Sequence, residues 1–346
     1  MKIRPHKLAS IVTRLKLGPE VQYTRRIESR SGQVLVVRAL EEKRVYDQVE
    51  LTTGRLAHVS KGDVIVGALG RRDALRGFVG RVPESIRAGD TIQLLNLGGV
   101  LGDAVSENRD VGHSLNVEVL GMVTRDGQGL NIEDAAIEPA DEGVRPPPLI
   151  VVSGTCMNSG KTVAACEIIG GLTQRGYAVG GAKLTGVSAV RDPLNMLDHG
   201  AVCTLTFMDC GLPSTAGIDD VAPVARRVLQ SIEREAGTEL DVVVAEMGDG
   251  IIGQYGVETI LRDPTFKSWI SAHVLTANDL VAAWGAARWM QEHDLILDVI
   301  AGPATDNAVG MRYVRDELNV GASNARTQAD TFVTLVEEAA FSRSHA

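Results

Sequence analysis

From residue 149 onward, short apolar segments alternate with longer amphipathic ones. The short segments are rich in β-branched residues and cover 149–153, 178–184, 201–207, 240–246, 272–276 and 295–301. Helical periodicity falls between and after them, over 161–175, 220–235, 278–291, 306–317 and 326–340. Strands that are apolar along their whole length indicate a sheet covered on both faces. The pattern therefore predicts a doubly wound, mostly parallel α/β domain.

Residues 1–140 follow a different pattern, in which short strands are separated by turn signals. The candidate strands are 33–40, 63–69, 78–80, 91–96 and 117–123. Their spacing predicts a smaller β-rich domain, a barrel or a sandwich, for substrate selection, as a lid or for interaction. The proline-rich stretch 141–148 is expected to be a semi-rigid linker to a P-loop domain at 149–346.

Composition narrows the class of protein. The chain has 346 residues, 44% hydrophobic and 23% charged, which allows two globular domains. A formal charge of −9 argues against nucleic acid as a partner. No apolar run has the length of a membrane span, and the basic N-terminus is not followed by a signal-peptide core. The four cysteines lack a C-x-x-C spacing, which favours reduced thiols in the cytoplasm.

A glycine-rich loop follows the strand at 149–153 and ends in Gly160-Lys161-Thr162. Strand, small-residue loop, Gly-Lys-Thr and helix is the order of a Walker A motif, whose backbone N–H groups surround phosphates. Five residues separate the two glycines, where the usual motif has four. Lys161 is expected to reach the terminal phosphates and the Thr162 hydroxyl to bind Mg²⁺. The expected nucleotide-binding residues of this stretch are Gly154, Thr155, Asn158, Ser159, Gly160, Lys161, Thr162 and Val163.

Later strand ends carry further candidates. Glu246 ends an apolar strand in the position of a Walker B acid, where a buried carboxylate needs a cation. Pro303 and Asn307 are candidates for contacts with the base, although Asn307 fits a helix N-cap equally well. The chain has no Asn-Lys-x-Asp guanine motif, so ATP is favoured over GTP.

The stretch Gly-Thr-Cys-Met-Asn-Ser-Gly-Lys-Thr, with Gly-Gly-Ala-Lys-Leu-Thr-Gly after it, resembles dethiobiotin synthetase. The similarity is close over 154–186 and extends in layout to about 305. It implies that Lys183 acts with Lys161 on the transferring phosphate. It also implies that Asp192 or Asp198, with a slight preference for Asp198, joins Thr162 and Glu246 at Mg²⁺. Substrate contacts are expected at Thr185, Gly186, Gly248, Asp249 and Gly250, and a homodimer is suggested by the family.

These features predict a cytoplasmic, ATP- and Mg²⁺-dependent ligase that acts on a small molecule through an acyl- or carbamoyl-phosphate, with no nucleic acid or membrane partner. Three alternatives stay open at this point. One is a small-molecule kinase, which needs no second nucleophile. The others are a nucleotide-switched metallochaperone or assembly NTPase, and an acyltransferase that binds coenzyme A with the same loop.

Overall fold

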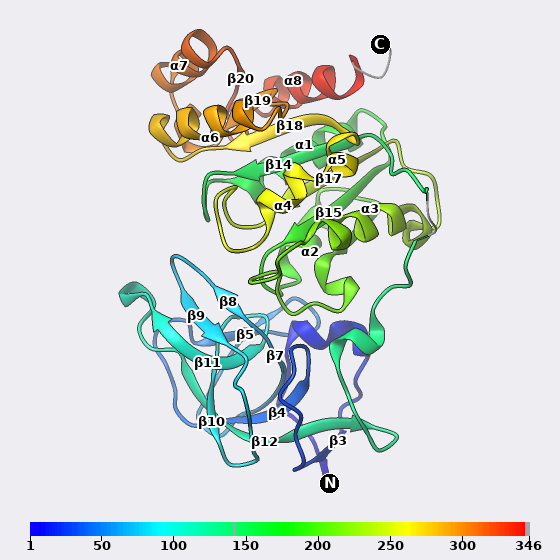
Figure 1. The fold of residues 1–346 in the computed structure, drawn as a ribbon, viewed down its shortest axis with the longest axis vertical. Coiled ribbons are helices and arrows are strands. Elements are labelled where there is room, and N and C mark those ends of the chain that lie inside the picture. Colours follow the sequence, from blue (N-terminus) through cyan, green and yellow to red (C-terminus); the bar gives the residue numbers. More distant parts are fainter. Residues whose placement is uncertain (141–142, 343–346) are drawn as a thin grey trace. The chain divides into compact units, whose positions relative to one another are not determined.

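The computed structural model describes residues 1–140 and 143–342, and its chain forms two compact units (Figure 1). We call the first the β unit; it comprises Met1–Glu138, Val187–Arg191 and Met208–Gly217. The second, the P-loop unit, comprises Pro139–Gly186, Asp192–Phe207 and the chain from Ile218 onward. Residues 141 and 142 of the predicted linker lie outside the described residues.

In the described part of the chain, the P-loop unit is built on a seven-stranded sheet of order β16-β15-β17-β14-β18-β19-β20. All neighbouring strands are parallel. The order in which the chain adds strands to the sheet reverses at β14. Strands β17, β15 and β16 lie on one side of it, and β18, β19 and β20 lie on the other. Ligands of open parallel sheets bind at such a point, beyond the carboxyl ends of the strands. The strands are β14 (Leu149–Gly154), β15 (Val179–Thr185), β16 (Cys203–Thr206), β17 (Val242–Met247), β18 (Ile270–Thr276), β19 (Val299–Ala301) and β20 (Gly321–Ala322).

Helices cover this sheet because the apolar strands have no face that can be left in water. Ile168, Ile169 and Leu172 of one helix pack with Phe332 and Val336 of another in a fully buried cluster over the central strands. The helices are α1 (Lys161–Gln174), α2 (Arg191–Asp198), α3 (Ala222–Ala236), α4 (Val257–Arg262), α5 (Pro264–Lys267), α6 (Leu280–Glu292), α7 (Ala308–Leu318) and α8 (Ala329–Ser342).

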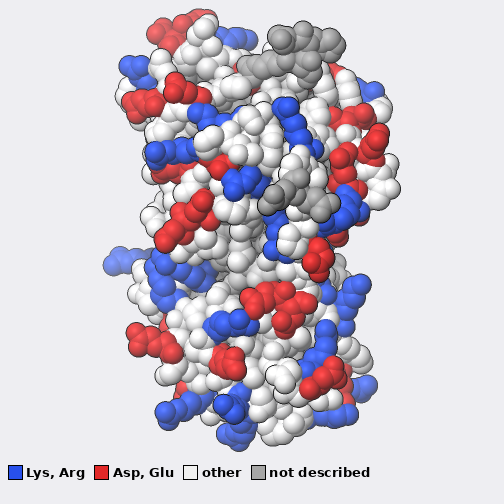
Figure 2. Space-filling view, turned by 45° about the vertical axis from the view of Figure 1, so that its right-hand side comes forward, with Lys and Arg blue, Asp and Glu red and all other residues white. Residues whose placement is uncertain are grey.

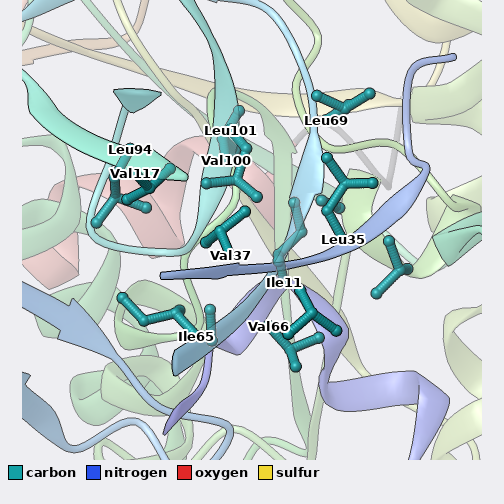
Figure 3. Packing of buried hydrophobic residues seen from close by; sticks show 14 of the residues in the cluster. Ile11, Leu35, Val37, Ile65, Val66, Leu69, Leu94, Val100, Leu101 and Val117 are labelled. Atoms are coloured by element: carbon teal, nitrogen blue, oxygen red, sulfur yellow. The ribbon is translucent and has the colours of Figure 1, made fainter. Parts of the chain in front are cut away.

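The β unit contains a closed barrel. Strand pairing runs β12–β4–β7–β11–β10 and returns to β12, so these strands leave no open edge on that path. Aliphatic side chains from facing strands fill the interior, among them Val37, Ile65, Leu94, Leu101 and Val117 (Figure 3). The strands of the unit are β1 (Lys2–Ile3), β2 (Lys7–Leu8), β3 (Val21–Thr24), β4 (Val34–Ala39), β5 (Gln48–Glu50), β6 (Leu56–His58), β7 (Val64–Leu69), β8 (Arg72–Asp73), β9 (Phe78–Arg81), β10 (Thr91–Leu94), β11 (Val100–Glu107), β12 (Leu115–Arg125) and β13 (Gln128–Gly129).

Two segments that are distant in sequence complete the β unit. The buried carboxylate of Glu50 accepts hydrogen bonds from the backbone N–H groups of Val190 and Arg191, at 2.7 and 2.9 Å. Asn96 donates to the Ser188 carbonyl at 2.6 Å, and the Ser188 N–H donates to the Pro213 carbonyl at 3.0 Å. Side chains of the N-terminal third of the chain therefore hold residues 187–191, and residues 208–217 are joined to them through Ser188.

The predicted fold class is confirmed: a parallel α/β fold with a loop of the P-loop type follows a β-rich region whose strands are mostly antiparallel. Strand β11 is not among the predicted strands, because its start, Gly98-Gly99-Val100-Leu101-Gly102, is rich in glycine, which is depleted in strands. Among the described residues, no helix is both long and apolar enough to cross a membrane. Side chains of both charges are mixed over the face shown in Figure 2.

Candidate nucleotide-binding site

The loop between β14 and α1 has the backbone geometry of an anion site. Asn158 and Gly160 have positive φ angles of 60° and 98°, which fold the loop back over the start of α1. The first N–H groups of α1 have no carbonyl within the helix to donate to, and they carry the positive end of the helix dipole. The loop is anchored to the end of β18: the Ser159 hydroxyl lies 2.7 Å from that of Thr276, and the Thr155 N–H donates to the Thr276 carbonyl at 2.9 Å.

Lys161 is folded into this loop. Its side chain is buried, and Nζ donates to the Cys156 carbonyl at 2.7 Å. Burial lowers the pKa of Lys161, and the nearby positive charge of Lys183 lowers it further, whereas the negative charges of Glu246 and Asp249 oppose the shift. An anion bound at the loop would stabilise the charged form of this lysine and replace a neutral carbonyl as its partner.

Thr162 and Glu246 form the second part of the site. The Thr162 hydroxyl donates to Oε1 of Glu246 at 3.0 Å, across the β14–β17 pairing that sets Val152 opposite Glu246. Glu246 is only 2% exposed, and its Oε2 has no hydrogen-bond partner within the described residues. A buried, unpartnered carboxylate oxygen beside a hydroxyl fits a hard cation such as Mg²⁺.

The same part of the chain contains no group of three or more His, Cys, Asp or Glu side chains that could hold a metal ion. Mg²⁺ would thus take its other ligands from phosphate oxygens and water, as it commonly does.

Lys183 lies opposite Glu246 in the β15–β17 pairing, and its ammonium group forms an ion pair with Asp192 in the first turn of α2. Asp192 is therefore engaged by a lysine in this structure. Asp198 is exposed at the end of α2, and no described contact joins it to Thr162 or Glu246.

The glycine-rich turn after β17 packs against the phosphate loop. The Thr185 hydroxyl donates to the Gly248 carbonyl at 2.9 Å, and a Cβ on Gly248 would lie 2.3 Å from the Thr185 carbonyl oxygen. A Cβ on Gly250 would lie 2.6 Å from the Thr155 carbonyl oxygen. Burial raises the pKa of Asp249, which lies between these glycines at a positive φ of 69°. Close packing thus explains the two glycines, while Gly186, at a φ of 133°, forms the adjoining bend.

A cavity of about 170 Å³ lies beside the phosphate loop. Three loops contribute to it: the phosphate loop with the start of α1, the loop after β19, and the loop after β20. Its lining residues are Asn158, Gly160, Val163, Gly302, Pro303, Asp306, Asn324, Ala325 and Arg326.

Of the two predicted base contacts, the cavity includes Pro303 but not Asn307. The Asn307 side chain caps α7 by accepting from the N–H groups of Val309 and Gly310. The strand end 302–307, which the sequence offers as a place to read the base, also brings Asp306 to the cavity. Sequence reasoning missed Asn324 and Arg326, because they follow β20, a strand of two residues that the pattern does not predict.

Fold and site together define a nucleotide-binding α/β protein of the P-loop type. Beyond that class, no protein-family model and no curated protein matches the chain.

Several solved structures are similar over about three fifths of the chain. The 54 kDa signal recognition particle protein of Aeropyrum pernix K1, in complex with GDP, is 17% identical, with a TM-score of 0.38 and coverage of 59% of this chain and 48% of that one. FtsY of Thermotoga maritima is 17% identical (TM-score 0.39, coverage 59% and 74%). Chloroplast FtsY of Physcomitrella patens is 15% identical (TM-score 0.37, coverage 59% and 70%). The chain thus matches about half the length of the first of these proteins, and the similarity is one of fold.

These findings correct the predicted family and activity. The similar structures are a signal recognition particle protein and FtsY proteins, so the expected relation to dethiobiotin synthetase is wrong. The ATP-dependent ligase is wrong with it, and the kinase, metallochaperone and coenzyme A alternatives gain no support. The predicted partners were a small-molecule substrate and a second copy of the chain, with neither nucleic acid nor membrane. This prediction is also overturned, because the similar structures are a signal recognition particle protein and the receptor FtsY. The nucleotide-binding P-loop fold stands.

Proposed function

We propose that the protein binds a nucleoside triphosphate with Mg²⁺ and hydrolyses it, and that the bound nucleotide acts as a switch. The observation that carries this proposal is the pair formed by Thr162 and Glu246, 3.0 Å apart, with one buried carboxylate oxygen unpartnered next to a phosphate-type loop. An unsatisfied buried acceptor costs about 1–3 kcal/mol, so the unpartnered oxygen favours a bound cation over a purely structural pair.

Each residue has a defined task in this proposal. The loop amides and the start of α1 bind the phosphates, and Lys161 moves from the Cys156 carbonyl to a phosphate oxygen. Thr162 and Glu246 would hold Mg²⁺, which would supply positive charge to offset that of the phosphates. Positioning and charge neutralisation are the main protein contributions to phosphoryl transfer, so no covalent step on the protein is required.

Lys183 supports the switch. It lies near enough to Lys161 to lower the pKa of that residue, yet it is paired with Asp192 of α2. A γ-phosphate at the loop would compete with Asp192 for the Lys183 ammonium group, and hydrolysis would return Lys183 to Asp192. The position of α2 would then depend on the nucleotide state, as the position of the moving element does in switches that work by an order–disorder change or a helix shift.

The test is phosphate release from GTP and from ATP, in parallel, with Mg²⁺ and with EDTA. We expect Mg²⁺-dependent turnover by the wild type and at least about a 100-fold loss in Glu246→Gln, as for removal of one electrostatic contact in a transition state. Asp198→Asn is the matched control and should retain turnover, because Asp198 is exposed and no described contact joins it to Thr162 or Glu246. Equal turnover of wild type and Glu246→Gln would refute the metal site.

A further inference from the structure

We infer that the cavity beside the phosphate loop holds the base of the nucleotide and that Asp306 selects guanine. This inference rests on the proposed function, because phosphates on the loop are what would bring a base to this place. The cavity shares Asn158, Gly160 and Val163 with the loop and the start of α1, so a ligand bound there by its phosphates extends directly into it.

Asp306 is held in a fixed orientation by a buried amide. Asn324 is 3% exposed, and its Oδ1 accepts from the N–H groups of Arg326 and Thr327, both at 3.0 Å. Because both partners are donors, the amide oxygen has to face them and the amide nitrogen has to face the other way. That nitrogen donates to Oδ1 of Asp306 at 2.8 Å. The second carboxylate oxygen of Asp306 accepts no hydrogen bond from the described residues and remains available to a ligand.

The chemistry of this oxygen favours one purine. Guanine presents two adjacent donors on its pairing edge, N1–H and the N2 amine, and both can donate to a carboxylate. Adenine presents an acceptor at N1 and no amine at position 2, so its N1 lone pair would face a negative oxygen. Hydrogen bonds to a charged acceptor are about twice as strong as neutral ones, which makes the carboxylate discriminating.

The remaining lining suits a flat ring. Pro303 and Ala325 are apolar, and Arg326 is exposed and forms no ion pair among the described residues. A planar guanidinium stacks on aromatic rings without regard to the identity of the base. Arg326 and Pro303 thus account for affinity toward any purine, and the choice between purines is left to Asp306.

Two other polar residues at nearby strand ends cap helices and do not line the cavity. Asp279 accepts from the Ala282 N–H at 2.8 Å at the start of α6, and Asn307 caps α7. Asp306 is therefore the carboxylate placed to read guanine, although the sequence lacks the Asn-Lys-x-Asp motif.

The test measures the affinities of GDP, IDP, ADP and XDP for the full chain with Mg²⁺ by calorimetry. Hypoxanthine lacks the N2 amine, so we expect IDP to bind about 10-fold and ADP about 100-fold more weakly than GDP, one factor of 10 for each lost or opposed hydrogen bond. In Asp306→Asn the new amide oxygen should stay with Asn324 and its NH₂ should face the base. The affinity for GDP should then fall about 100-fold. XDP, whose C2 carbonyl can accept a hydrogen bond from that NH₂, should bind to this variant more tightly than GDP does. Asp316→Asn on α7 is the control and should keep the wild-type order.

The failures are distinguishable. Equal wild-type affinities for GDP, IDP and ADP, or tighter binding of ADP, would overturn the guanine inference and leave the proposed function intact. The same holds if Asp306→Asn weakens all four nucleotides equally, which a structural role would produce. If none of the four binds in the presence of Mg²⁺, the proposed function fails and the base site falls with it.

Discussion

The substitution Glu246→Gln distinguishes two roles of this residue, a metal ligand and an acid that stabilises the fold. The substitution keeps the shape of the side chain and removes its charge. The hydrogen bond from Thr162 becomes neutral, which costs about 1 kcal/mol, because charge-assisted bonds contribute about 1.5–3 kcal/mol and neutral ones about 0.5–1.5. In return, a neutral NH₂ group replaces the unpartnered charged oxygen, and relief of the cost of burying that charge is worth about 1–3 kcal/mol. We therefore expect the free energy of unfolding without nucleotide to stay within about 1 kcal/mol of wild type, or to rise.

The assay is urea unfolding followed by tryptophan fluorescence. All three tryptophans, Trp269, Trp284 and Trp289, lie in the P-loop unit, so the signal reports on the unit that contains the substitution. Glu258→Gln is the control, since it removes an exposed ion pair with Arg262 that is worth at most about 0.5 kcal/mol. A loss of 3–5 kcal/mol in Glu246→Gln would refute the reasoning, because that is the cost of breaking a buried ion pair that stabilises the fold.

Three further predictions concern the P-loop unit. Burial lowers the pKa of His273 to about 4, so the unfolded state binds its proton more readily than the folded state does. This residue should therefore lower the free energy of unfolding by about 3 kcal/mol as pH drops from about 6.5 to about 4. Urea unfolding at each pH should show a fall that is smaller by that amount in His273→Gln than in wild type. Gly302→Ala should lower the free energy of unfolding by about 1–3 kcal/mol and weaken nucleotide binding, because a Cβ at its φ of 85° would lie 2.5 Å from a carbonyl oxygen of the phosphate loop. Gly285→Ala, in open space on α6, is the control and should raise the free energy of unfolding by about 0.5–1 kcal/mol, measured by thermal unfolding. Asp192→Asn should raise affinity for a non-hydrolysable triphosphate severalfold, without a matching rise for the diphosphate, because it frees Lys183; unchanged calorimetric affinities would count against the switch.

The sequence was sufficient for the α/β class and for the strand, Gly-Lys-Thr loop and helix at residues 149–174, since these depend on local pattern. That Glu246 faces a metal stays a prediction. The sequence was insufficient where partners are distant in the chain. Asp306 is oriented by Asn324, which lies on another loop, and Glu50 binds backbone groups at residues 190 and 191. Asn307 shows the limit of local signals, because an asparagine before a helix fits a cap and a base contact equally until its partners are known.

The most direct test of a phosphate site at this loop is calorimetric titration with a non-hydrolysable GTP analogue and Mg²⁺. Lys161→Ala removes the ammonium group that lies within the loop, and the exposed Lys61 of the β unit provides the matched control as Lys61→Ala. We predict that Lys161→Ala loses at least about 100-fold in affinity, in line with about 3 kcal/mol for a charge-assisted contact, while Lys61→Ala binds as the wild type does. Equal affinities for Lys161→Ala and wild type would contradict the account.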